Sequence, residues 1–131
     1  LFDENEKDNN EIQVKSKSTA RKLKRAFVGR SRQVEILAAH IDSCRHPVFL
    51  AGDFNDTPVS FAYRKLRGEL NDAFLDSGTK GMGKTYNGRF PSFRIDYIFY
   101  PESFESAEFK ILGRHYSDHF PISCRFRKTP E

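Results

Sequence analysis

Five polar residues stand next to apolar segments in a pattern that could do chemistry. Asp53 and Asn55 follow the apolar run VFLAG, Asp96 lies inside RIDYIF, and Asp118 and His119 come directly before FPISCRF. A single aspartate after a strand is usually a turn former or a helix cap. Each group alone therefore predicts only a loop, and the chemistry depends on whether the fold brings the groups together.

Asp96 has the most restrictive surroundings, because Ile95 and Tyr97 flank it. Burying an unpaired carboxylate is costly, so this side chain must be paired or must face a solvated cleft. One interpretation is a salt bridge to Arg94 or to another basic side chain. The other is that Asp96 holds His119, fixing its tautomer and raising its basicity as a general base acting on water requires.

The remaining groups fit the same chemistry. Asp53 could hold or deprotonate a water, and the Asn55 amide could donate a hydrogen bond to a developing oxyanion. Asp118 could bind a hard cation through oxygen. A water, a divalent cation and an oxyanion donor together favour hydrolysis of a phosphoester.

The first half of the chain is expected to be mainly helical. Residues 1–13 are polar and predict a tail or loop, and apolar residues at three- and four-residue steps predict helix over 14–44, with Gly29 as a break. The run at 48–52 predicts a buried strand. Thr57 and Pro58 are typical of a helix start, and this helix would end at Gly68.

The second half is expected to be mainly strands. Residues 71–77 predict a short strand and the glycine-rich stretch 78–88 a loop. Aromatic and β-branched residues then predict strands over 93–100, 106–113 and 120–127. Helices followed by strands indicate an α/β or α+β protein, and 131 residues fit one domain.

Composition excludes several classes of protein. Hydrophobic residues make up 37% of the chain, which is typical of a globular protein, and two cysteines are too few for a disulfide framework. No apolar run is long enough to span a membrane, so we expect no membrane contact by this chain. The basic segment at 15–32 could contact phosphates, although such a segment is usually a solvated helix face.

Three motifs, GDFN, RIDYIF and SDHFPI, occur in this order and each lies beside a predicted strand. Together they resemble the C-terminal part of the endonuclease/exonuclease/phosphatase superfamily, the deoxyribonuclease-I-like phosphoesterases, over about residues 30–127. The resemblance implies half of a four-layer α/β sandwich, with a mixed, largely antiparallel sheet flanked by helices. It also implies a hydrolase that depends on Mg²⁺ or Mn²⁺.

The resemblance implies a role for each polar residue. Asp53 would orient or activate the attacking water, and Asn55 would contact the scissile phosphate. Asp96 would orient the catalytic His119. Asp118 would be a ligand or near neighbour of the metal ion.

The chain departs from the family pattern in one large respect, because the N-terminal half of the domain is missing. A glutamate that is a principal metal ligand, an early asparagine and a second histidine are missing with it. The only methionine is Met82, so we expect the sequence to be a piece of a longer protein. Three expectations follow: the metal is weakly bound or absent, the isolated chain is inactive, and it self-associates or swaps elements to cover an apolar sheet face.

The substrate is less constrained than the reaction. A phosphoester is expected, and nucleic acid is possible, with Arg89 and Arg94 as candidate phosphate contacts. The chain has no tryptophan to stack on bases, and an inositol phosphate or a lipid head group also fits. The alternative to an enzyme is a non-catalytic module of the same fold that binds a phosphate or a partner.

Overall fold

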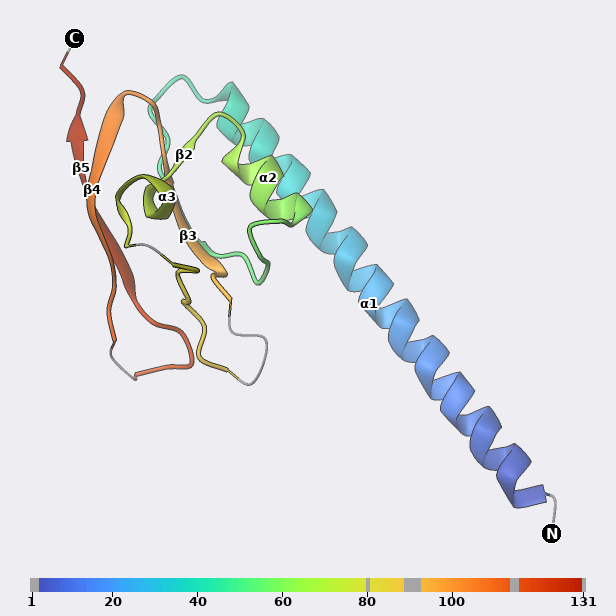
Figure 1. The fold of residues 1–131 in the computed structure, drawn as a ribbon. Helices are drawn as coiled ribbons and strands as arrows, with labels where there is room; N and C mark the ends of the chain where they lie inside the picture. The colour runs from blue at the N-terminus through green and yellow to red at the C-terminus, as the bar shows by residue number, and fades with distance from the viewer. Residues whose placement is uncertain (1–2, 80, 89–92, 114–115, 131) are drawn as a thin grey trace. The chain divides into compact units, whose positions relative to one another are not determined.

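The structure is a computed structural model that describes residues 3–79, 81–88, 93–113 and 116–130. Figure 1 shows the order of the elements along the chain. The chain divides into two compact units, Leu1–Val34 and Glu35–Glu131, which are described separately below. No helix among the described residues has an apolar stretch that could cross a membrane.

Helix α1 (Asp3–Ser43) is uninterrupted, which differs from two expectations. Residues 3–13 are helical instead of a tail, because acidic residues in the first turns favour the helix N-terminus and no proline interrupts the segment. Gly29 does not break the helix, since one glycine costs only about 1 kcal/mol relative to alanine. Strong helix formers on both sides offset that cost.

In the first unit, every side chain from residue 16 to residue 30 is exposed. The basic residues of this segment thus form a solvated helix face. Leu23, Phe27 and Val28 are also 57–66% exposed. The segment therefore has no apolar core of its own.

Helix α2 (Phe61–Arg67) begins at Ser60 instead of Thr57. The Ser60 hydroxyl accepts a hydrogen bond from the Tyr63 N–H at 3.1 Å, as an N-cap does. The Thr57 carbonyl instead accepts from the Ser60 N–H and forms the turn before the helix. The predicted end at Gly68 is confirmed, with a φ of 46° that favours glycine.

Three antiparallel strands form a sheet in the order β1-β3-β2. They are β1 (Leu50–Asp53), β2 (Asn71–Asp72) and β3 (Asp96–Tyr100). The expected strand over 71–77 is confirmed only for its first two residues. Asp72 then caps a short helix, α3 (Ala73–Ser77), because its carboxylate accepts from the Phe74 N–H.

Strands β4 (Phe104–Ile111) and β5 (Ile122–Lys128) form a second, two-stranded antiparallel sheet. Its exposed side chains include the ion pairs Arg125–Glu108 and Arg127–Glu105, at 3.2 and 2.6 Å. The solvent face of this sheet is therefore polar. The expectation that the chain self-associates or swaps elements to cover an apolar sheet face stays a prediction.

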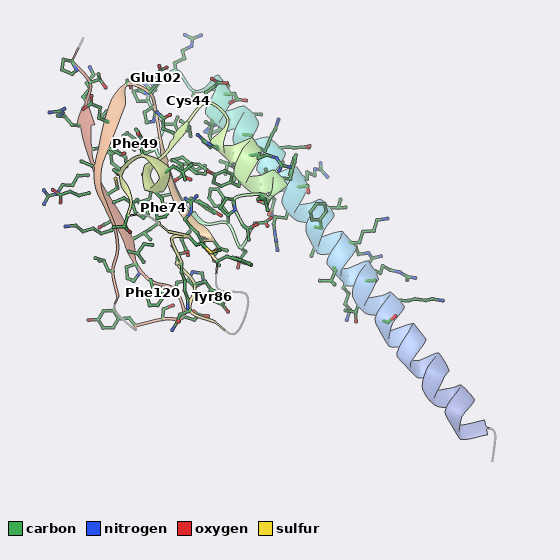
Figure 2. All side chains as sticks on the ribbon, in the orientation of Figure 1. Cys44, Phe49, Phe74, Tyr86, Glu102 and Phe120 are labelled. Carbon is green, nitrogen blue, oxygen red and sulfur yellow. The ribbon has the colours of Figure 1, made fainter. Side chains whose placement is uncertain are left out.

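The main core lies between α3 and the two sheets. Its buried residues are Ala73, Phe74, Tyr100 and Phe109. Phe74, labelled in Figure 2, projects from α3 and meets Phe109 of β4 edge to face. A second aromatic group joins Phe54, Tyr63, Tyr97 and Phe99. The fold is a mixed α/β arrangement with antiparallel sheets, as predicted.

Candidate active site

The register of β1 and β3 places two acidic side chains opposite one another. Asp53 pairs with Asp96, and the backbone pairing continues one residue further, where the Phe54 N–H donates to the Ile95 carbonyl at 2.9 Å. Directly opposed residues of antiparallel strands have Cβ atoms about 5 Å apart, and like charges in such a pair repel. A hydrogen-bond donor or a cation near both carboxylates would offset this repulsion.

His119 provides such a donor. Its Nδ1 lies 2.9 and 3.2 Å from the two Asp96 oxygens, and its Nε2 lies 3.7 Å from Asp53 Oδ2. The predicted contact between Asp96 and His119 is confirmed. The three side chains are partly exposed, with 15% for Asp96, 29% for His119 and 34% for Asp53, so water can reach them.

The surroundings raise the pKa of His119 above its usual value. The hydrogen bond to Asp96 is the main cause, and the charges of Asp96, Asp53 and Asp118 act in the same direction against partial burial. Because a carboxylate can only accept, the Nδ1 atom carries the proton in the neutral imidazole. Its Nε2 lone pair is then available on the side of Asp53.

The loop that carries His119 is held by backbone pairing with residues 85–87. Tyr86 forms an isolated antiparallel bridge with His119, and the Asn87 N–H donates to the Asp118 carbonyl at 2.7 Å. The Tyr86 ring also lies against the imidazole, with ring centroids 5.2 Å apart. Figure 2 labels Tyr86 and also Phe120, which directly follows His119. The sequence indicated only a glycine-rich loop here.

Asn55 lies in a tight turn directly after β1. Its φ is 51°, a region that asparagine tolerates better than most residues. Its N–H donates to Asp53 Oδ1 at 2.7 Å, so this turn fixes one oxygen of Asp53 while the other faces His119. The GDFN motif thus gives a rigid orientation to its aspartate.

A cavity of about 390 Å³ opens beside His119. Its lining combines polar groups with an apolar wall: Asn55, Asp56, Thr57, Tyr86, Phe93, Ile95, Asp118 and His119. A larger cavity of about 620 Å³ lies between the end of α1 and α2 and includes none of the predicted site residues. The smaller cavity is therefore the candidate site, because predicted site residues line it.

Arg94, one of the two arginines proposed as phosphate contacts, does not line this cavity. Arg94 is only 3% exposed and donates to both Asp72 oxygens, at 2.7 and 2.9 Å. Its guanidinium also lies over the rings of Phe74 and Tyr97. The structure thus places Arg94 in the core, where Asp72 is its partner instead of Asp96. Arg89 lies outside the described residues.

The described donors fit a metal ion only in part. Asp53, Asp96 and His119 each offer a ligand atom, and these atoms lie within 4.8 Å of one another. However, one oxygen of Asp53 accepts from the Asn55 N–H, and Asp96 is already bonded to His119. Asp118 lines the cavity, and its Oδ1 accepts from the Ser117 hydroxyl. Mg²⁺ prefers six oxygen ligands, which is more than these side chains supply.

Solved structures with a similar fold support this architecture. A mannosyl-6-phosphatase from Bacteroides thetaiotaomicron has a TM-score of 0.63 and 23% identity over 75% of this chain and 45% of its own. An endonuclease/exonuclease/phosphatase family protein from the same organism has a TM-score of 0.61 and 23% identity. The match covers 74% of this chain and 43% of that protein. A functionally unknown conserved protein from Enterococcus faecalis has a TM-score of 0.65 and 18% identity. The match covers 76% of this chain and 44% of that protein.

These similarities show the fold, and they show how much of it is present. The chain spans less than half the length of the solved structures that it matches. No curated protein matched the sequence significantly. The Endonuclease/Exonuclease/phosphatase family does match, over residues 19–119, and its members are phosphoesterase hydrolases. The chain therefore belongs to the Endonuclease/Exonuclease/phosphatase family.

Proposed function

We propose that this chain is the C-terminal part of a metal-dependent phosphoesterase domain that hydrolyses phosphodiester or phosphomonoester bonds with water activated by His119. One observation carries the proposal. The imidazole lies between Asp96, at hydrogen-bond distance, and Asp53, at 3.7 Å. A general base needs a fixed tautomer and a free lone pair beside a place for water, and this arrangement provides both.

The distance between Nε2 and Asp53 defines the place for the attacking water. At 3.7 Å the two atoms are too far apart for a direct hydrogen bond, and a water to one side of them, about 2.8 Å from each, would bond to both. That water would donate to Nε2 and to Asp53. His119 would then take one proton of the water as its oxygen attacks phosphorus, and Asp96 would stabilise the resulting imidazolium. As the new P–O bond forms, the ester P–O bond would break, and the leaving oxygen would take a proton from solvent.

Asn55 and Asp118 act on the other side of the reaction in this proposal. The Asn55 amide, in the cavity wall, would donate to a phosphoryl oxygen as negative charge develops. Asp118 would be a ligand of Mg²⁺ or Mn²⁺, and the bound ion would neutralise charge on the phosphoryl group. Because further ligands would be needed, we propose that this chain alone binds the ion weakly and is inactive by itself.

The chemical class of the substrate follows from the cavity only in outline. Tyr86, Phe93 and Ile95 give the cavity an apolar wall beside its polar groups, which suits an organic group attached to the phosphate. One similar structure is named a mannosyl-6-phosphatase. A sugar phosphomonoester is therefore worth testing beside a phosphodiester, and nucleic acid stays within the proposal.

The test is hydrolysis of bis-p-nitrophenyl phosphate, p-nitrophenyl phosphate and mannose 6-phosphate with Mg²⁺ or Mn²⁺. It is run on this chain and on the longest natural protein that contains it. The longer protein is expected to hydrolyse at least one substrate, and His119→Ala should lower its turnover roughly 100-fold or more. His40→Ala, a change at an exposed position of α1, is the matched control. Equal turnover in both variants would contradict the proposal.

The incomplete set of metal ligands favours a second candidate, a non-catalytic module that binds a phosphate or a partner. Calorimetry with Mg²⁺ on the same two proteins separates the candidates. Binding by the longer protein with little binding by this chain supports the enzyme. Phosphate binding without metal binding or hydrolysis in either protein supports the module.

A further inference from the structure

Thr85 is fully buried beside the candidate site, and neither the predicted chemistry nor the family motifs involve it. Its relative exposure is 0%, although it lies in the glycine-rich stretch between α3 and β3. A threonine in such a stretch is usually exposed. Its burial raises the question of where its hydroxyl is bonded.

The Thr85 hydroxyl is bonded to the backbone that precedes and begins β3. Its Oγ1 accepts from the Ile95 N–H at 3.0 Å and from the Asp96 N–H at 3.1 Å. A hydroxyl oxygen has two lone pairs, so these two donors use its full acceptor capacity. The hydroxyl thereby fixes the peptide plane from which the Asp96 side chain projects.

The backbone of Thr85 is bonded to the other member of the pair. Its carbonyl accepts from the Phe120 N–H at 2.7 Å, directly after His119. The bridge between Tyr86 and His119 extends the same pairing. Thr85 thus connects to Asp96 through its side chain and to the His119 loop through its main chain.

We infer that Thr85 is a positioning residue that sets the hydrogen bond between Asp96 and His119. The inference rests on the proposed function only for its catalytic consequence. Asp96 and His119 are 23 residues apart, and Thr85 is bonded to the backbone at or next to both of them. Small displacements of groups that act on a substrate are costly, and residues that orient such groups commonly contribute 10-fold to 100-fold to activity.

Two variants separate positioning from simple packing. Thr85→Val keeps the shape of the side chain and removes the acceptor, so the Ile95 and Asp96 N–H groups lose their partner. Thr85→Ser keeps the acceptor and removes one methyl group. Thr79→Val makes the same chemical change at an exposed threonine and is the matched control. If Thr85 acts only through packing, Thr85→Ser should disturb the Asp96–His119 hydrogen bond more than Thr85→Val does. If Thr85 is a positioning residue, Thr85→Val should disturb it more.

The first readout is the nuclear magnetic resonance signal of the His119 Nδ1 proton in this chain, which does not require activity. We expect a downfield proton signal in the wild type, in Thr85→Ser and in Thr79→Val, and its loss to solvent exchange in Thr85→Val. A signal that persists in Thr85→Val would overturn the inference. So would its loss in Thr85→Ser.

A measurement on the wild type covers the case in which Thr85→Val does not fold. The amide hydrogens of Ile95 and Asp96 should exchange with solvent as slowly as those within the β1–β3 pairing. Rapid exchange of both would overturn the inference. Slow exchange, with the Nδ1 signal retained in Thr85→Ser, supports it.

Kinetics on the longer protein test the catalytic consequence. Thr85→Val should lower kcat roughly 10-fold to 100-fold and leave KM within about twofold, and Thr85→Ser should restore most of the rate. An equal loss in both variants would overturn the positioning role. If the Nδ1 signal responds as expected and no protein hydrolyses any substrate, the inference holds and the proposed function fails.

Discussion

Two acid–base pairs beside the same strand have opposite characters. Asp72 and Arg94 are 1% and 3% exposed, and every oxygen of Asp72 is bonded within the core. Asp96 and His119 are partly exposed, and no described residue makes a hydrogen bond to the second imidazole nitrogen, beside a cavity. A pair that is fully enclosed and fully bonded stabilises the fold, whereas a pair with a free lone pair facing water can move protons.

The largest expected difference between the two pairs is in stability. Asp72→Asn would leave the buried Arg94 charge without its partner and should cost about 3–5 kcal/mol of unfolding free energy. The same change at Asp96 should cost less than about 1 kcal/mol, because His119 can lose its proton. Urea unfolding of both variants measures this difference. Equal losses of unfolding free energy in the two variants would contradict the view that only the Asp72–Arg94 pair stabilises the fold.

The second expected difference is in activity. Asp96→Asn should lower kcat of the longer protein by roughly 10-fold to 100-fold, since an amide cannot hold the imidazolium as a carboxylate does. KM should change little. Steady-state kinetics on p-nitrophenyl substrates provide the measurement. A variant with wild-type kcat would remove Asp96 from the proposed mechanism.

The third prediction concerns the core around Arg94. A Cβ on Gly83 would lie 2.5 Å from Cζ of Phe74, and the φ of Gly83 is 65°, so Gly83→Ala should cost about 1–3 kcal/mol. Gly52→Ala is the control, since nothing lies within 4 Å of its added Cβ. Thermal unfolding compares the two. A larger loss at Gly52 would mean that Phe74 is not packed as described.

The smallest predicted effect is the pH dependence of His119. Its pKa is raised, so the protonated imidazole stabilises the fold fully below about pH 6.5, and this stabilisation is lost as pH rises through the raised pKa. Hydrolysis should increase over the same interval, because only the neutral imidazole accepts a proton. Titration of the His119 ring signals measures the pKa. Asp96→Asn should lower it, and an unchanged value would contradict the stated cause.

The sequence predicted that Asp96 is paired or faces a solvated cleft, because few arrangements tolerate a carboxylate between Ile95 and Tyr97. It left Arg94 and His119 open as partners, and the resemblance of the three motifs to a known family favoured His119. The end of α2 needed only local sequence, since Gly68 has a backbone conformation that few other residues adopt.

Other features depend on contacts that local sequence does not contain. Thr57 and Ser60 both have side chains that can cap a helix. Residues 57–60 form a turn, closed by the hydrogen bond from the Ser60 N–H to the Thr57 carbonyl, so the helix begins after Ser60. The partner of Arg94 is 22 residues away, and the bridge at Tyr86 depends on how two loops meet. In the sequence, only the β-branched Thr85 and the aromatic Tyr86 within the glycine-rich stretch indicated extended backbone at that bridge.

The central claim is that Asp96 and His119 act as one unit on a phosphoester. A double-mutant cycle on kcat of the longer protein tests it most directly, using Asp96→Asn, His119→Ala and the combined variant. If the pair acts as a unit, the combined variant should be within about twofold of His119→Ala. Losses that multiply would show that the two residues act independently and would contradict the account.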